Sequence, residues 1–460
     1  MFALLAGCRE PTVEDLAPVV DPAPLAPTVL RIGWDGASGP TGWHAEATPT
    51  DGGRTVVSDP ASDGAVTLYG VKAGRRYDVV AVTDAGDRSP PATIDVAPAP
   101  DAIPPTSVVL AEGAVVVDGY VATSVVYLAD GHSVLVVVDG DGDVVWWWDP
   151  GTAWDVSTVT ASADGSAFVF GQFDAAVASD RAEAVELAPD GETRAKFAIP
   201  GAHHVALGLG DDAYAWLELT TRAEAVDGVE ILAGTDRIVE GGPDGDRRVV
   251  YDAFDDLYAD GFHYPCLHSR RAADRYGIPD LVQWTHGNSL VYLPDDDAFV
   301  LNERWADTVV KVDRASASVV WQLGGPASSF TFPDGASTVT TADAPVLWSH
   351  GHLSDAWSDG LWMFDNGDHR DPPTSRAVRY AIDEDARTVT LAQEIPAPDG
   401  AFVEVLGDAR RLPDGHALVT WSELGLIHDV APDGSVGWAL QLDGDLVVGR
   451  ARYFDSFGRL

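Results

Sequence analysis

Positive charge is scarce in this 460-residue chain. It holds 29 Lys and Arg against 72 Asp and Glu, a net charge of −43, and its only lysines are Lys72, Lys196 and Lys311. An acidic surface of this kind repels the phosphates of nucleic acid and the headgroups of anionic lipids. The composition therefore argues against a nucleic-acid-binding protein and against docking on a membrane through a basic face.

Cysteine is also scarce, with only Cys8 and Cys266 in the chain. Leu5-Ala6-Gly7-Cys8 resembles a bacterial lipobox, so we interpret residues 1–8 as a truncated lipoprotein signal and Cys8 as the lipidated residue. This interpretation predicts a lipid-anchored protein of the cell envelope, in the periplasm or at the cell surface, with Cys8 as its only membrane contact. The alternative is an ordinary frayed terminus. Acylation of Cys8 would leave Cys266 without a disulfide partner.

Disorder is excluded by the apolar content, because 46% of the residues are hydrophobic and there are 15 Trp, 14 Phe and 12 Tyr. Prolines among acidic residues at 9–28 indicate an extended tether. Residues 29–98 alternate short β-rich runs with turns and are similar to a fibronectin type III domain, with Tyr77 as its corner tyrosine and Trp43 in its core. Residues 99–105 indicate a stiff linker.

Residues 106–460 repeat one pattern, in which an Asp-containing turn precedes an apolar run and a second turn precedes an outer strand. Two hairpins give four strands per repeat. Six such repeats predict an all-β fold with a six-bladed β-propeller after the small sandwich. The first turns of the repeats are Leu128–Gly131, Ser162–Gly165, Leu209–Asp212, Leu293–Asp296, Trp357–Gly360 and Leu412–Gly415.

Two groups of side chains within the repeats are candidates for a site. Asp139, Asp141 and Asp143 could form a calcium loop, but the tight turn before Val144 and the lack of a closing Glu favour an ordinary turn. Three histidines, in contrast, stand at comparable distances before the first turns of three consecutive repeats: His204, His286 and His352. Inner strands line the axis of a propeller, so these side chains should converge there.

Hairpin geometry adds two neighbours to the histidines. Residues at equal distances from a turn face each other, which places Arg304 near His286 and Asn366 near His352. Three imidazoles could hold a metal ion. With an arginine they also suit a tetrahedral oxyanion, because the guanidinium matches its oxygens and a neutral imidazole can attack it. The second possibility fits transfer of a sulfuryl or phosphoryl group.

The motif details resemble the bacterial, PAPS-independent arylsulfotransferase family over roughly residues 120–455. The resemblance rests on the following segments: His286–Ser289, Asn302–Arg304, Val319–Gly325, His352 with Phe364–Gly367, and Leu412–Gly415 through Gly449–Arg452. It implies a six-bladed propeller after an N-terminal β-sandwich. It also implies a ping-pong reaction without PAPS, metal or other cofactor, in which a sulfuryl group passes from an aryl sulfate through a sulfohistidine to a phenol.

By this resemblance, His352 is the nucleophile, and His204, His286 and Arg304 bind the sulfuryl oxygens, with Asn366 beside them. Gly351 departs from the family pattern, which has Gln before the nucleophile, and His350 is therefore a second candidate. We expect only one of His350 and His352 to face the channel, since neighbours alternate in a strand, and His203 and His204 pose the same choice. Two other functions stay open: a non-catalytic propeller that binds a ligand or partner, and a metal-dependent hydrolase.

Overall fold

The computed structural model describes residues 17–34, 42–61, 64–111, 113–115, 118–127, 132–151, 154–156, 158–174, 181–226, 229–257, 278, 280–340 and 346–457. Cys8, Cys266 and the predicted turn at residues 128–131 lie outside these ranges. Within them the chain is all-β, as predicted, and the only α-helix is the single turn α1 (Ala253–Asp256). No helix in the described part is long and apolar enough to cross a membrane.

Two small sheets form the N-terminal sandwich, one in the order β1-β2-β5 and one in the order β4-β3-β6-β7. Trp43 and Tyr77 lie in its core, and the Tyr77 hydroxyl accepts a hydrogen bond from the Lys72 backbone N–H at 2.9 Å. This bond from a residue just upstream is the arrangement of a tyrosine corner. The strands are β1 (Val19–Ala23), β2 (Ala26–Gly33), β3 (Trp43–Pro49), β4 (Val56–Val57), β5 (Val66–Leu68), β6 (Arg76–Thr83) and β7 (Ala92–Asp95).

The predicted tether at residues 9–28 is wrong in its second half, because β1 and the start of β2 occupy it. Proline was the misleading signal. An edge strand tolerates proline, since half of its backbone donors face away from the sheet, and Pro22 stands at a bulge of the edge strand β1. Ala23 and Ala26, where β1 meets β2, are buried in one apolar cluster with Trp146 and Phe168 of the propeller.

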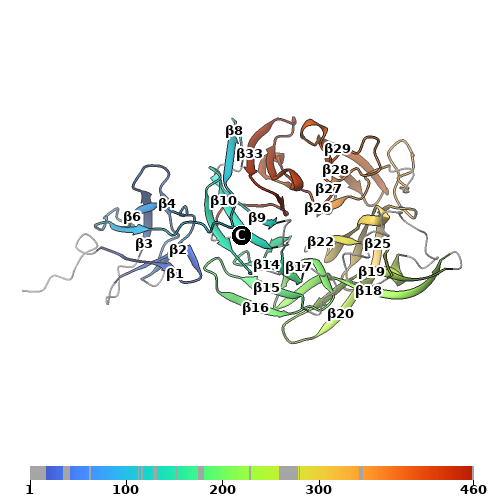
Figure 1. The fold of residues 1–460 in the computed structure, drawn as a ribbon, viewed down its shortest axis with the longest axis horizontal. Coiled ribbons are helices and arrows are strands. Elements are labelled where there is room, and N and C mark those ends of the chain that lie inside the picture. The colour runs from blue at the N-terminus through green and yellow to red at the C-terminus, as the bar shows by residue number, and fades with distance from the viewer. Residues whose placement is uncertain are drawn as a thin grey trace, which may run out of the picture.

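Six further sheets follow one another along the chain and lie around a common centre (Figure 1). In five of them two consecutive strands are joined at a first turn predicted from the sequence. The first sheet contains β9 (Tyr120–Tyr127), β10 (Ser133–Asp139) and β11 (Val144–Trp148), and the second contains β12 (Trp154–Asp155), β13 (Val159–Ala161), β14 (Phe168–Asp174), β15 (Glu183–Leu187) and β16 (Thr193–Ala198). The third contains β17 (Ala202–Gly210), β18 (Ala213–Val226), β19 (Val229–Gly241), β20 (Arg247–Asp252) and β21 (Leu281–Gln283), and the fourth contains β22 (Gly287–Leu293), β23 (Ala298–Glu303), β24 (Thr308–Asp313) and β25 (Ser318–Gly324). The fifth contains β26 (His352–Trp357), β27 (Gly360–Asp365), β28 (Arg376–Asp383) and β29 (Thr388–Pro396), and the sixth contains β30 (Asp408–Arg411), β31 (Ala417–Trp421), β32 (Leu426–Val430) and β33 (Val436–Leu442).

Both ends of the propeller segment close the ring. Strand β8 (Thr106–Leu110) adds to the outer edge of the last sheet through β33, whereas β34 (Leu446–Val448) and β35 (Arg452–Phe454) pair with β9 in the first. Each closing sheet therefore joins strands from the beginning and the end of the segment. Short 3₁₀ turns lie between strands at Arg304–Ala306, Pro398–Gly400, Pro413–Gly415 and Ser422–Leu424.

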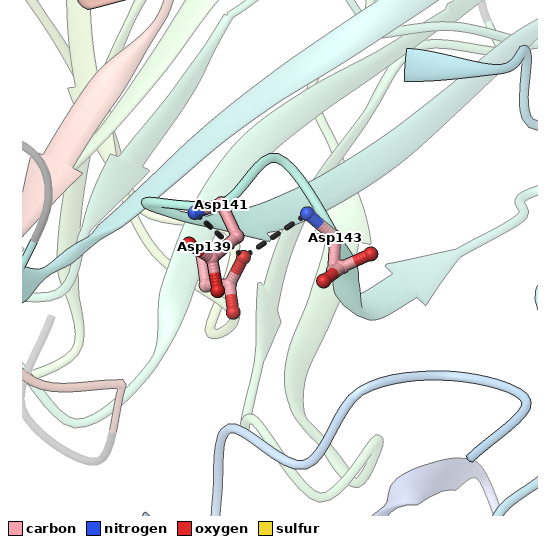
Figure 2. Close-up of side chains that lie close together, drawn as sticks. All are labelled: Asp139, Asp141 and Asp143. Atoms are coloured by element: carbon pink, nitrogen blue, oxygen red, sulfur yellow. Dashed lines mark hydrogen bonds between the residues drawn. The ribbon is translucent and has the colours of Figure 1, made fainter. Parts of the chain in front are cut away.

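The acidic turn between β10 and β11 contacts the sandwich rather than forming an isolated acidic loop. Figure 2 shows Asp139 accepting the backbone N–H groups of Asp141 and Asp143, at 3.1 and 3.0 Å. The Lys72 ammonium lies 3.0, 2.7 and 2.5 Å from the three carboxylates. Burial of the ammonium favours a lower pKa, but the three carboxylates outweigh burial and raise the pKa of Lys72. The turn therefore contributes an ionic contact between the two domains.

We expect Lys72→Met to lower the free energy of unfolding by about 1–2 kcal/mol, because it leaves the partly buried Asp139 without its cation while two exposed carboxylates regain water. Lys196→Met is the matched control, since Lys196 forms one exposed pair with Glu183 and should cost less than about 0.5 kcal/mol. Urea unfolding of both variants is the measurement. Equal losses would contradict the role given to Lys72.

Candidate active site

Bulges re-aim side chains at the start of three consecutive inner strands. The register shifts between His203 and Ala206 in β17, between Gly287 and Ser289 in β22, and between Leu353 and Asp355 in β26. Each bulge adds residues on one strand and turns their side chains relative to the sheet. All three bulges lie beside the histidines singled out in the sequence.

His204 and His286 contact each other near the centre of the propeller, with their imidazole centroids 5.0 Å apart. Strand alternation predicts that the His203 side chain lies on the opposite face from His204, but the two side chains lie together. Nδ1 of His203 lies 2.7 Å from Nδ1 of His204, because His204 occupies the left-handed region at φ 60° inside the bulge. His203 turns its other nitrogen toward Asp236, at 2.8 Å.

The predicted register of the histidines needs a correction. Trp284–Asn288 and Trp348–His352 share a Trp-x-His-Gly pattern, and His286 and His350 both have φ 52°. His286 is therefore the structural counterpart of His350, and Asn288 is the counterpart of His352. Counting from the turns misplaced them because β22 and β23 are joined by four residues, whereas β26 and β27 are joined by two.

Buried aspartates of the preceding sheet support both His-Gly turns. Asp236 accepts the Gly287 N–H at 2.6 Å, and Asp307 accepts the His350 N–H at 2.6 Å. The Asn288 and Asn302 amides donate to the Gly351 carbonyl, at 3.1 and 2.7 Å. The bonds to His350 and Gly351 position the backbone that leads into His352.

One hydrogen bond defines the tautomer of His352. The Asn366 amide nitrogen donates to the carbonyls of Val403 and Leu406, at 2.8 and 3.1 Å, so its amide oxygen is the atom that faces His352. This oxygen lies 2.8 Å from Nδ1 of His352, confirming the predicted neighbourhood. The proton therefore resides on Nδ1, and Nε2 carries a lone pair.

Arg304 stands at the beginning of the 3₁₀ turn that follows β23. Its backbone N–H donates to the His286 carbonyl at 3.2 Å, as the hairpin arithmetic predicts. The side chain is 4% exposed and donates to the carbonyls of His350 and Glu404, at 3.2 and 2.7 Å. Its guanidinium carbon lies 4.6 Å from the Trp305 ring. These two carbonyls hold it at hydrogen-bond distance, and the Asp368 carboxylate lies farther away, at 3.9 Å.

The electrostatics of the site keep its imidazoles neutral. Burial, and then the charges of Arg304 and Arg450, lower the pKa of His352 well below its ordinary value. Burial and His204 lower the pKa of His286, and burial and His203 lower that of His204, which keeps partial exposure. Neutral imidazoles beside a buried cation form a centre that attracts an anion and can attack it.

Arg450 is a residue of this centre that sequence reasoning missed. It is 3% exposed and donates to the carbonyls of Leu353 and Asn288, at 3.1 and 3.0 Å. It thereby links the β26 and β22 sheets at the axis. Its segment, 449–452, belongs to the family resemblance, but a lone arginine outside the repeated histidine positions carries no signal of its own.

His350, the second candidate for the nucleophile, lies outside the strand. It precedes β26, so the alternation argument does not apply to it. Its side chain is fully buried, with Nδ1 2.8 Å from Asp368 and its ring between those of Trp305 and His369, at centroid distances of 4.6 and 4.5 Å. Burial lowers the pKa of His350 to about 4, although Asp368 opposes the shift.

Metal-ligand geometry does not occur among these histidines. Within the described residues, three ligand atoms of His, Cys, Asp or Glu approach within 4.8 Å only at Asp139, Asp141 and Asp143. Those carboxylates contact Lys72. The clustered ligand atoms of the described residues therefore lie at the contact with the N-terminal sandwich and not at the axis.

The fold and the site define an all-β propeller protein with a buried, imidazole-rich cationic centre. A model of the arylsulfotransferase (ASST) family matches residues 116–436. The match spans well over half of the chain, which therefore belongs to the arylsulfotransferase family. No curated protein sequence matches it.

Solved structures resemble the chain only distantly. Virginiamycin B lyase from Staphylococcus aureus is 10% identical, with 75% of this chain and 98% of that chain covered and a TM-score of 0.38. A putative 6-phosphogluconolactonase from Bacteroides fragilis is 12% identical, with 91% and 100% covered and a TM-score of 0.36. Such low similarity carries no statement about activity.

We expect Asn366→Ala to change the tautomer of His352, because the Nδ1 proton loses the oxygen that holds it. Nitrogen-15 NMR of histidine-labelled protein is the measurement, with the His352 signals assigned by their loss in His352→Asn. The wild-type protein should show a neutral, Nδ1-protonated ring near pH 7, and the variant a shift toward the Nε2–H form. An Nε2-protonated wild-type ring would contradict the assignment.

Proposed function

We propose that this chain is an aryl-sulfate sulfotransferase in which His352 carries the sulfuryl group between a donor aryl sulfate and an acceptor phenol. The observation that carries the proposal is the Asn366 contact. It holds the Nδ1 proton of a neutral, buried imidazole and leaves the Nε2 lone pair as the attacking atom. A protonated or freely rotating imidazole would be a poorer nucleophile.

In the donor half-reaction, Nε2 of His352 forms a bond to sulfur while the bond from sulfur to the aryl oxygen breaks. The electron pair leaves on the phenolate. In the acceptor half-reaction, a phenol oxygen attacks the same sulfur while its O–H proton passes to a basic group of the site, the nitrogen–sulfur bond breaks, and His352 recovers its lone pair. The chemistry is a ping-pong exchange between two oxygens and needs no cofactor.

Charge on the sulfuryl oxygens is the main obstacle to an attack by nitrogen. Arg304 supplies a buried cation that the carbonyls of His350 and Glu404 hold in place. His204 and His286 lie side by side at the two sheets that precede the sheet of His352 and border the same site. Fixed donors in a site with little water stabilise developing charge more strongly than donors in water do. These three residues are the proposed binding site for the sulfuryl group.

We expect His352→Asn to abolish phenol-dependent release of p-nitrophenol from p-nitrophenyl sulfate, with a loss of at least about 10³-fold in kcat. His350→Asn should retain measurable transfer, because His350 supports the Arg304 carbonyl contact without touching the substrate. The steady-state rate with added phenol is the measurement.

Two results would contradict the assignment of His352 as the residue that carries the sulfuryl group. One is transfer that survives His352→Asn and disappears in His350→Asn. The other is a wild-type protein that turns over no aryl sulfate at all, which would favour a propeller that only binds its ligand.

A further inference from the structure

Four ionisable side chains follow one another from the partly exposed His204 at the proposed active site into the buried interior. Nδ1 of His204 lies 2.7 Å from Nδ1 of His203, and Nε2 of His203 lies 2.8 Å from Oδ1 of Asp236. His203 and Asp236 are 1% and 0% exposed. Glu303, also fully buried, lies beyond Asp236 and accepts the Tyr251 hydroxyl at 3.4 Å. The proposed reaction leaves His203, Asp236 and Glu303 without a role.

Asp236 is held as a carboxylate with one oxygen toward His203. Its Oδ2 accepts the Thr285 hydroxyl and, at 2.6 Å, the Gly287 N–H. Although burial opposes it, His203 and these donors lower the pKa of Asp236. Burial, and then the charge of Asp236, raise the pKa of Glu303 well above its usual value. The negative charge of this carboxyl pair therefore lies on Asp236, next to His203.

The three imidazoles of the site differ in the partner of Nδ1. In His352 it is the Asn366 amide oxygen, and in His286 it is Gln283 Oε1, at 2.7 Å. An amide oxygen does not take up a proton at neutral pH. In His204 the partner is another imidazole, which can take up a proton and is backed by a buried carboxylate. This difference singles out His204.

We propose that His203 and Asp236 are positioning residues that store the proton of the phenol, with His204 as the group that exchanges it with the substrate. This inference rests on the proposed sulfuryl transfer. It adds a proton route through His204 to that reaction.

The proton balance closes over the two half-reactions. When a phenol attacks the sulfohistidine, its O–H proton moves to Nε2 of His204 while the Nδ1 proton of His204 moves to Nδ1 of His203. His203 is then an imidazolium paired with Asp236. In the next donor half-reaction the steps reverse, and Nε2 of His204 gives its proton to the departing phenolate. No net proton is gained or lost in a full cycle.

The experiment compares two donors that differ in their need for a proton. The p-nitrophenolate ion leaves readily without being protonated. Phenol has a pKa of about 10, as the tyrosine side chain does, so phenolate is a poor leaving group unless it receives a proton. Single-turnover release of each phenol is measured without acceptor in wild type, His203→Gln and Asp236→Asn. In Asp236→Asn the carboxamide oxygen can still accept from Thr285 and Gly287, so the local fold is kept.

We expect both variants to slow release from phenyl sulfate by about 10²-fold, the lower end of the usual contribution of general acid–base catalysis. Release from p-nitrophenyl sulfate should change less than about threefold, which also shows that the variants fold. His416→Gln is the matched control, because it breaks another His–Asp contact, at 2.7 Å, away from the site. It should leave the ratio of the two rates unchanged.

Equal slowing with both donors, or none with either, would overturn the proton role while leaving the sulfuryl transfer in place. A wild-type protein with no release from either donor would overturn both proposals. A second measurement needs no variant: wild-type release in deuterium oxide should show a larger solvent isotope effect with phenyl sulfate than with p-nitrophenyl sulfate. Equal isotope effects would also count against the relay.

Discussion

The contact between His352 and Asn366 is the interaction on which the proposed chemistry depends. It fixes which imidazole nitrogen carries the proton, and it does so because three carbonyls in the loop at 403–406 already bind the Asn366 amide nitrogen. That loop lies between the fifth and sixth propeller sheets. The proposed nucleophile is thus oriented by the packing of neighbouring sheets around the axis, and not by its own strand alone.

The acidic surface and the cationic centre are compatible because they act over different distances. Salt screens exposed charges beyond about 8–10 Å, whereas Arg304 and Arg450 are buried and act directly on the imidazoles beside them. The same cations that would attract the proposed sulfate ester also lower the pKa of His352. The −43 net charge therefore opposes long-range approach of an anion without weakening its binding at the axis.

Much of the fold followed from turn residues, because Asp-Gly and similar pairs between β-branched runs indicate hairpins, and those hairpins recur in the structure. His204, His286, Arg304 and Asn366 followed from counting away from the turns. Counting residues back from the turns gave the wrong alignment of the repeats where a bulge or a longer turn intervened. The structural counterpart of His286 is therefore His350 and not His352. His203 and Asp236 could not be predicted, because their contact depends on a left-handed residue inside a bulge and on a strand more than thirty residues away.

The most direct test of the account is to find the sulfuryl group on the protein. The enzyme is mixed with p-nitrophenyl sulfate without acceptor, quenched in base to preserve a nitrogen–sulfur bond, digested and analysed by mass spectrometry. The account predicts one sulfuryl group on His352, which disappears when phenol is added before the quench. Release of p-nitrophenol with no modified His352, or with the group on His350, would contradict it.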